Sequence, residues 1–89
     1  MTIRHFRKKP ITIAAVQWTG DNADELVEFT GGRFRALSPG GAITAEVFDD
    51  LHATWVGVMT DQWVIRGVKG EFYPCDPDVL AETYDEATD

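Results

Sequence analysis

The most strongly β-patterned stretch of the chain, residues 11–18, reads Ile11-Thr-Ile-Ala-Ala-Val-Gln-Trp18. Its β-branched residues predict a strand, and Pro10 marks a place where the strand can begin. Apolar side chains occur at both odd and even positions of this stretch, which is typical of an interior strand that is covered on each side. Gly20-Asp21-Asn22 ends this strand, and the apolar period then changes from that of a strand to that of a helix.

The segment that follows predicts a short helix over about residues 22–30. Its apolar stripe, at the spacing i, i+3, i+4 and i+7, consists of Ala23, Leu26, Val27 and Thr30. Asn22 with Glu25 three residues later is a capping-box arrangement, and Gly31 suits the left-handed residue that closes a helix. A helix of this length is not stable alone in water, so we expect it to dock on a sheet.

The rest of the chain is rich in short strands that are separated by turns. We expect strands over residues 33–37, 63–68 and 71–73, a β-rich segment over 46–60 that includes His52, and turns over 38–41 and 69–70. Asp76 as N-cap and Pro77 at the first helical position predict a last helix over about residues 77–84, docked by Val79, Leu80 and Tyr84.

These elements together predict an α+β fold in one small domain over residues 1–89. It would have about four or five short, mostly antiparallel strands, one helix on a face and a short C-terminal helix. Of the 89 residues, 44% are hydrophobic and 26% are charged, which excludes disordered, collagen-like and coiled-coil chains. A single cysteine, Cys75, excludes an internal disulfide, so packing or homo-oligomerisation must stabilise the core.

The charges are strongly polarised along the chain. Four of the eight basic residues are Arg4, Arg7, Lys8 and Lys9, whereas all fifteen acidic residues follow residue 20. We expect the basic segment 1–9 and the acidic tail 85–89 to be flexible. The negative body disfavours direct nucleic-acid binding and favours basic partners. No apolar run is long enough for a membrane span or a secretory signal, so we expect a cytoplasmic protein without a membrane partner.

The residue types that carry catalysis occur singly. Ser38 lies in a predicted turn, Cys75 is flanked by Pro74 and Asp76, and His52 has no second histidine or cysteine at metal-ligand spacing. The paired glycines lack the strand–loop–helix context of a phosphate cradle. We therefore predict a non-enzymatic protein with no catalytic residue, no metal and no cofactor.

Aromatic residues are the feature that rises above this background. The chain has three tryptophans, and Phe72 and Tyr73 are adjacent. One interpretation places most of these rings in the core. The other places some of them beside a basic group, as a wall that stacks a ring and pairs with an anion. The ligand-binding residues of this second interpretation are Trp18, Trp63, Arg66 and Tyr73.

Two stretches resemble a family of small proteins carried by many tailed bacteriophages and prophages. They are Lys8-Lys-Pro-Ile-Thr-Ile-Ala-Ala-Val-Gln-Trp-Thr-Gly-Asp-Asn22 and Trp63-Val-Ile-Arg-Gly-Val-Lys-Gly-Glu-Phe-Tyr-Pro-Cys-Asp-Pro-Asp78, followed by Thr83-Tyr84. The likeness covers about half of the chain directly, and residues 33–50 match only loosely. Thr60-Asp61-Gln62 stands where the family commonly has Pro-Gly-Asp, which indicates a turn that feeds a strand. The resemblance implies a phage or prophage origin and the cytoplasm of a bacterial host, but no activity.

Three functions are compatible with these observations. The first is an accessory protein that acts by binding, either sequestering a host signalling nucleotide or inhibiting a host defence protein. The second is an acidic decoy of a nucleic-acid-binding host protein that uses residues 76–89. The third is a minor virion or assembly component, for which oligomerisation would be the activity.

Overall fold

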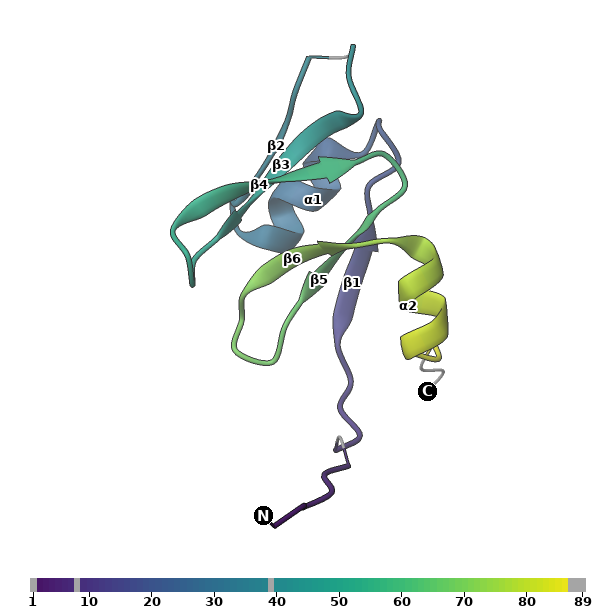
Figure 1. The fold of residues 1–89 in the computed structure, drawn as a ribbon. Coiled ribbons are helices and arrows are strands. Elements are labelled where there is room, and N and C mark those ends of the chain that lie inside the picture. The colour runs from purple at the N-terminus through teal and green to yellow at the C-terminus, as the bar shows by residue number, and fades with distance from the viewer. Residues whose placement is uncertain (1, 8, 39, 87–89) are drawn as a thin grey trace.

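The chain folds into short strands and two short helices. The computed structural model describes residues 2–7, 9–38 and 40–86 (Figure 1). The elements in these residues are β1 (Ala14–Gln17), α1 (Ala23–Thr30), β2 (Phe34–Ala36), β3 (Ile43–Asp49), β4 (Thr54–Met59), β5 (Trp63–Arg66), β6 (Phe72–Cys75) and α2 (Pro77–Thr83). The predicted α+β class is confirmed, with six strands in two small sheets.

Both sheets are antiparallel and have three strands. One sheet has the order β2-β3-β4, and the other has the order β1-β5-β6. β3 and β4 form one hairpin and β5 and β6 another, whereas β1 pairs with the distant β5, with Ala14 opposite Arg66 and Gln17 opposite Trp63. Figure 1 shows β2-β3-β4 in the upper half of the view and β1-β5-β6 in the lower half.

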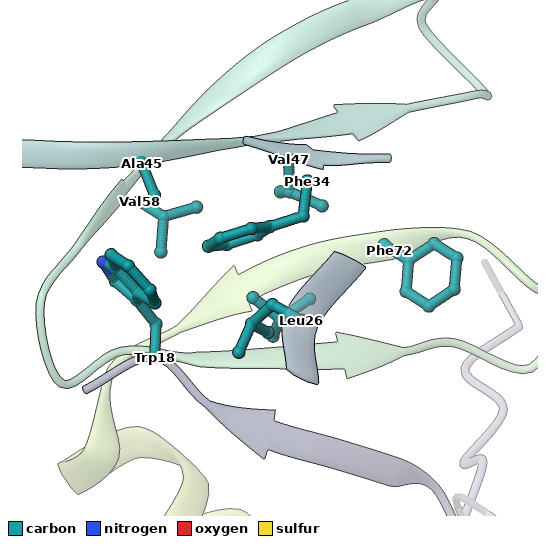
Figure 2. Packing of buried hydrophobic residues seen from close by; sticks show 8 residues of the cluster. Trp18, Leu26, Phe34, Ala45, Val47, Val58 and Phe72 are labelled. Carbon is teal, nitrogen blue, oxygen red and sulfur yellow. The ribbon is translucent and has the colours of Figure 1, made fainter. Parts of the chain in front are cut away.

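The hydrophobic core lies between the two sheets. Phe34, Ala45, Val47 and Val58 point from β2, β3 and β4 toward Trp18, Leu26 and Phe72 (Figure 2). Val64 of β5 completes the buried cluster, and Leu26 enters it from α1. Each sheet of three short strands has too little surface to be stable alone, so the fold depends on this shared interior.

Trp18 joins the two sheets at one end of the core. Its indole Nε1–H donates to Thr44 Oγ1 at 2.9 Å, and the ring meets Phe34 edge-on with centroids 5.1 Å apart. Thr44 lies at a break in the β3–β4 register, where the extra residue of a bulge turns its hydroxyl toward the core. The Trp18 N–H donates to Gln62 O at 2.9 Å, and the Asp61 N–H donates to Trp18 O at 2.6 Å. One residue therefore holds β1, the β4–β5 turn, β2 and β3 together.

The prediction of an interior strand over residues 11–18 is wrong. The regular strand covers only Ala14–Gln17, and β1 is an edge strand whose pairing partner is β5. Val16 packs against the core, while Ala15 lies on the opposite face of the sheet. Apolar residues at both odd and even positions thus show that both faces of the strand are apolar. They do not show whether another strand pairs with its edge.

α1 has the predicted bounds but a different cap and a shifted stripe. Asn22 precedes the helix, yet its side chain accepts from the Thr19 N–H and donates to Gln17 O and to Glu25 Oε1, which replaces the predicted capping box. Gly31 adopts the expected left-handed conformation, with φ of 64°. Val27 is 40% exposed, because the buried side of the helix is centred on Leu26 and Thr30 and is flanked by Phe29.

Two further expectations have definite outcomes, and others fall partly on residues that the structure does not describe. His52 lies in the turn between β3 and β4 and not in a strand, because residues 50–53 reverse the chain inside the β-rich segment. α2 ends one residue before the predicted boundary, and Pro77 occupies its first turn as expected. Residues 1, 8 and 87–89 of the segments expected to be flexible, and residue 39 of the predicted 38–41 turn, lie outside the described residues.

Replacing Leu26 tests whether α1 is held by the shared core. Leu26 is fully buried, so Leu26→Ala should lower the free energy of unfolding by about 2–5 kcal/mol, measured by urea denaturation. Val27→Ala removes a neighbouring, 40% exposed side chain from the same helix and should cost less than about 1 kcal/mol. Equal losses from the two variants would contradict the placement of the helix.

Candidate functional site

The four residues predicted to form a ligand wall are divided among three places. Trp18 is 2% exposed and belongs to the core. Arg66 lies on the face of β1-β5-β6 that looks toward the core, where it is opposite the buried Phe72. Trp63 and Tyr73 occupy alternate positions of β5 and β6 that share the other face. The structure therefore brings Trp63 and Tyr73 to one face and separates them from Trp18 and Arg66.

Arg66 closes the rim of the core. Its guanidinium carbon lies 4.6 Å from the ring centroid of Phe29 and 5.8 Å from that of Phe72. Its Nη2 also donates to Phe29 O at 3.2 Å, which ties β5 to the end of α1. The guanidinium of Arg66 is therefore engaged by other residues of the protein, and these contacts give it a structural role.

Trp63 lies in a groove between β1 and α2. The groove has a volume of about 760 Å³ and is lined on one side by residues 11–15 and on the other by Pro77, Leu80, Ala81 and Tyr84. Asp85 and Glu86 also line the groove and give it negative charge. Burial, together with the charge of nearby Tyr84, raises the pKa of Tyr73.

A second apolar surface covers the outside of the β2-β3-β4 sheet. We call it the aromatic face, and its residues are Arg35, Ile43, Phe48, Trp55 and Met59. The Arg35 guanidinium carbon lies 3.9 Å from the ring centroid of Trp55, and Phe48 meets Trp55 edge-on at 5.4 Å. Ile43 and Met59 are 43% and 39% exposed, while Phe48 and Trp55 are half-buried. The stacked arginine thus holds the tryptophan ring in a fixed orientation at the surface.

Strand alternation puts these side chains outside. Val47 and Val56 face the core, so the next residue in β3 and the preceding one in β4, Phe48 and Trp55, must point away from it. Gly57 leaves space for Ile43, because a Cβ there would lie 3.0 Å from Ile43 Cγ2. Both helices of the described chain are engaged elsewhere, since Leu26 of α1 is in the core and α2 borders the groove. The aromatic face is therefore left without a covering helix.

Charged side chains on and near the aromatic face are paired with one another. Arg35 Nη2 lies 2.7 Å from Glu46 Oε1, and Arg33 Nε lies 2.7 Å from Asp50 Oδ2. In the turn that follows β3, the His52 ring beside Asp49, with Nδ1 at 2.6 Å from the carboxylate, lowers the pKa of Asp49. Exposed Trp, Phe, Ile and Met side chains beside the Arg35–Glu46 pair are the composition of a protein-binding surface.

The sequence contained a signal for this surface. Each strand of the β-rich segment alternates, and its core-facing positions are filled by Val47 in β3 and by Val56 and Val58 in β4. The alternate positions carry Phe48 in β3 and Trp55 in β4, so an expectation of one solvated face would have placed these rings outside. Trp55 was not among the predicted site residues, because no basic residue near it in sequence suggested a ligand.

The residues considered for chemistry remain apart. Cys75 ends β6, whereas His52 lies in the β3–β4 turn of the other sheet. Burial and the charge of Asp76 raise the pKa of the Cys75 thiol, which keeps it in its less nucleophilic form. Across residues 2–7, 9–38 and 40–86, no three His, Cys, Asp or Glu side chains gather in a group that could hold a metal ion.

No family model, curated protein or solved structure matches the chain. Neither helix of the described residues has the length and apolar character required to cross a bilayer.

The reactivity of Cys75 should follow its raised pKa. Alkylation by iodoacetamide across a pH series should reach half of its maximal rate at a higher pH in the folded protein than in the urea-unfolded chain. Asp76→Asn removes the nearby negative charge and should shift this midpoint downward. A folded protein whose thiol titrates below that of the unfolded chain would contradict the environment described.

Proposed function

We propose that this chain is an accessory protein of phage or prophage origin that acts by binding a protein of the bacterial host through the aromatic face. The observation that carries the proposal is the exposed stack of Arg35 on Trp55, with Phe48 against the same ring. Tryptophan and arginine are the residues most enriched among those that dominate binding energy in protein interfaces.

The stack is suited to binding because it is already ordered. Arg35 is held on one side by Trp55 and on the other by Glu46, whose Oε1 also accepts from Arg35 Nε at 2.8 Å. A side chain fixed before binding loses little rotamer freedom when a partner covers it. Ile43 and Met59 add exposed apolar side chains on the same side of the sheet, beyond Gly57.

The charge of the domain restricts the chemistry of the partner. Beyond residue 9 the chain has fifteen acidic and four basic residues, and Glu46 lies on the same side of β3 as Phe48. Such a field accelerates association with a positively charged surface and slows association with a nucleic acid. The partner proposed is therefore a protein with an apolar centre and a basic rim.

The phage setting rests on the sequence resemblance of residues 8–22 and 63–78. In an infected bacterium, a small protein that performs no chemistry can act by occupying a host protein. We propose that this chain inhibits a host defence protein in this way. Sequestration of a signalling nucleotide has less support, because the basic member of the predicted wall, Arg66, is engaged by Phe29.

Affinity capture with matched variants tests the proposal. Purified protein would be immobilised and exposed to lysate of infected bacteria, with Trp55→Ala and Tyr73→Ala compared with the unchanged chain. A basic host protein should be retained by the unchanged chain and by Tyr73→Ala, and should be lost with Trp55→Ala. Tyr73 is the matched control, because it is an aromatic residue on the outer face of the other sheet. Retention should also weaken as salt is raised.

The opposite pattern would contradict the aromatic face as the site. A partner that is lost with Tyr73→Ala or Trp63→Ala and kept with Trp55→Ala would place binding on the β1-β5-β6 sheet. Tight binding of a cyclic dinucleotide or an ADP-ribose-type nucleotide, followed by tryptophan fluorescence and unaffected by Trp55→Ala, would replace the proposal with nucleotide sequestration. Circular dichroism of each variant must match the unchanged chain for these comparisons to hold.

A further inference from the structure

β4 forms one edge of the β2-β3-β4 sheet, and part of its backbone is directed away from the sheet. In a strand, the N–H and C=O of one residue point to one edge, and those of the next residue point to the other. The Phe48 N–H donates to Arg33 O at 2.8 Å, so Phe48 directs its backbone groups at β2. Trp55 stands opposite Phe48 in β4 and therefore directs its own groups outward, as does Gly57 two residues later.

The outward groups of Trp55 and Gly57 are free in the part of the chain that the structure describes. Met59, the next residue of the series, is closed by Gln62, whose N–H donates to Met59 O at 3.1 Å and whose Oε1 accepts from the Met59 N–H at 2.8 Å. No such bond reaches Trp55 or Gly57 from the described residues. Gly57 has no side chain and is only half-buried, so the part of it that solvent reaches is backbone. The edge of β4 thus offers the N–H and C=O groups of both residues to another strand.

The other edges of the two sheets are blunted in ways that proteins use against strand pairing. β2 has only three residues and carries the charged Arg35. β6 contains Pro74, which has no N–H to offer. At the end of β1, Gln17 O accepts from Asn22 Nδ2 at 2.8 Å. β4 has six residues, Thr54–Met59, without a charge or a proline. Among the strands of the described chain, its edge is the best suited to pair with another strand.

The side chains beside this edge leave room for a second backbone. The Trp55 ring contacts Phe48 of β3 and Arg35 of β2, so it lies over the sheet and not beyond its edge. A glycine inside a strand often marks a place where another backbone approaches closely, and Gly57 is the next outward residue. Neither outward residue of β4 therefore places a side chain in the path of an incoming strand.

A second copy of β4 fits this edge in one two-fold register. With Trp55 of each copy opposite Gly57 of the other, every outward N–H and C=O of these residues finds a partner. Val56 then lies opposite its own copy on the two-fold axis, and core-facing side chains stand beside core-facing ones. A register centred on Gly57 would need the groups of Met59, which Gln62 already holds, and one centred on Trp55 would use that residue alone.

We propose that two copies of the chain pair antiparallel through the free edges of β4, which joins their β2-β3-β4 sheets into one continuous sheet. The strand has no charged side chain, so two copies of it meet without like charges placed opposite one another. The two-fold arrangement gives both copies the same contacts and puts their aromatic faces on the same side of the joined sheet. The pairing does not depend on the proposed host partner, and it leaves the aromatic face of each copy open to such a partner.

Amide hydrogen exchange at two protein concentrations, followed by NMR, tests the pairing. The amides of Trp55 and Gly57 should exchange at least about tenfold more slowly at about 1 mM than at about 10 µM, because these N–H groups are bonded only in the dimer. The Val56 amide is directed at β3 and should be slow at both concentrations. Ala15, which is directed at the free edge of β1, should not respond to concentration. Exchange at Trp55 and Gly57 that is independent of concentration, or a response at Ala15 in their place, would overturn the proposal.

Gly57→Pro, with Gly57→Ala as its matched control, tests the hydrogen bond itself. Both replacements add a Cβ, which would lie 3.0 Å from Ile43 Cγ2, but only proline removes the outward N–H. Light scattering after size exclusion should show the unchanged chain rising from 9.9 kDa toward twice that mass with concentration. Gly57→Pro should have a dissociation constant at least about tenfold above that of Gly57→Ala. Equal constants in folded variants, or a mass of one copy for the unchanged chain up to about 1 mM, would overturn the proposal. If Gly57→Pro loses the circular dichroism of the unchanged chain, the amide exchange decides alone.

Salt separates this contact from the proposed contact with a basic host protein. Each copy has a formal charge of −7, so added salt screens the repulsion between copies and should strengthen the dimer, whereas it should weaken the host complex. A dimer that dissociates as salt is raised would rest on opposite charges and would overturn the neutral β4 edge as the contact. A chain that is monomeric alone, with Trp55 and Gly57 amides protected only in a host complex, would replace the second copy with a strand of the host.

Discussion

The hydrogen bond from the Trp18 indole N–H to Thr44 Oγ1 is the contact on which the arrangement of the two sheets depends. Thr44 Oγ1 also lies 2.8 Å from Thr60 Oγ1, so the indole is tied through Thr44 to β3 and to the turn that follows β4. A buried tryptophan is stable only if its N–H finds a partner, and here that partner belongs to the opposite sheet. The bond therefore fixes the distance and the register between two sheets that could not be stable separately.

This constraint determines which aromatic residues remain at the surface. The core is small and is filled by Trp18, Phe34 and Phe72 together with aliphatic side chains. Trp55 and Trp63 are consequently left on the outer faces of the two sheets, one stacked under Arg35 and the other beside α2. The two outer faces differ in chemistry, since one is an ordered aromatic surface and the other is a groove beside a free strand edge.

Local sequence patterns predicted the elements well. The helix period between Gly20 and Gly31, and Pro77 after Asp76, located both helices to within about one residue. The position of β1 in its sheet could not be predicted in the same way, because apolar residues on both parities show that two faces are apolar and say nothing about hydrogen bonding at the edges.

The site was harder to predict than the fold. The prediction for Trp18, Trp63, Arg66 and Tyr73 was a wall of aromatic rings beside a basic group, but in antiparallel strands neighbouring residues alternate between faces. Arg66 thus joined the rim of the core, and Tyr73 the outer face. The stack of Arg35 on Trp55 depends on the pairing of β2, β3 and β4. Such a contact between residues 20 positions apart becomes visible only when the register is known.

Hydrogen exchange of the three indole N–H groups, followed by NMR, tests this account most directly. The Trp18 N–H should exchange only when the whole domain unfolds, with an opening free energy equal to that of global unfolding, while those of Trp55 and Trp63 should exchange much faster. If the Trp18 N–H exchanges as fast as the other two, or if the Trp55 N–H is the protected one in the isolated chain, the two sheets are not joined as described and the aromatic face is not a surface.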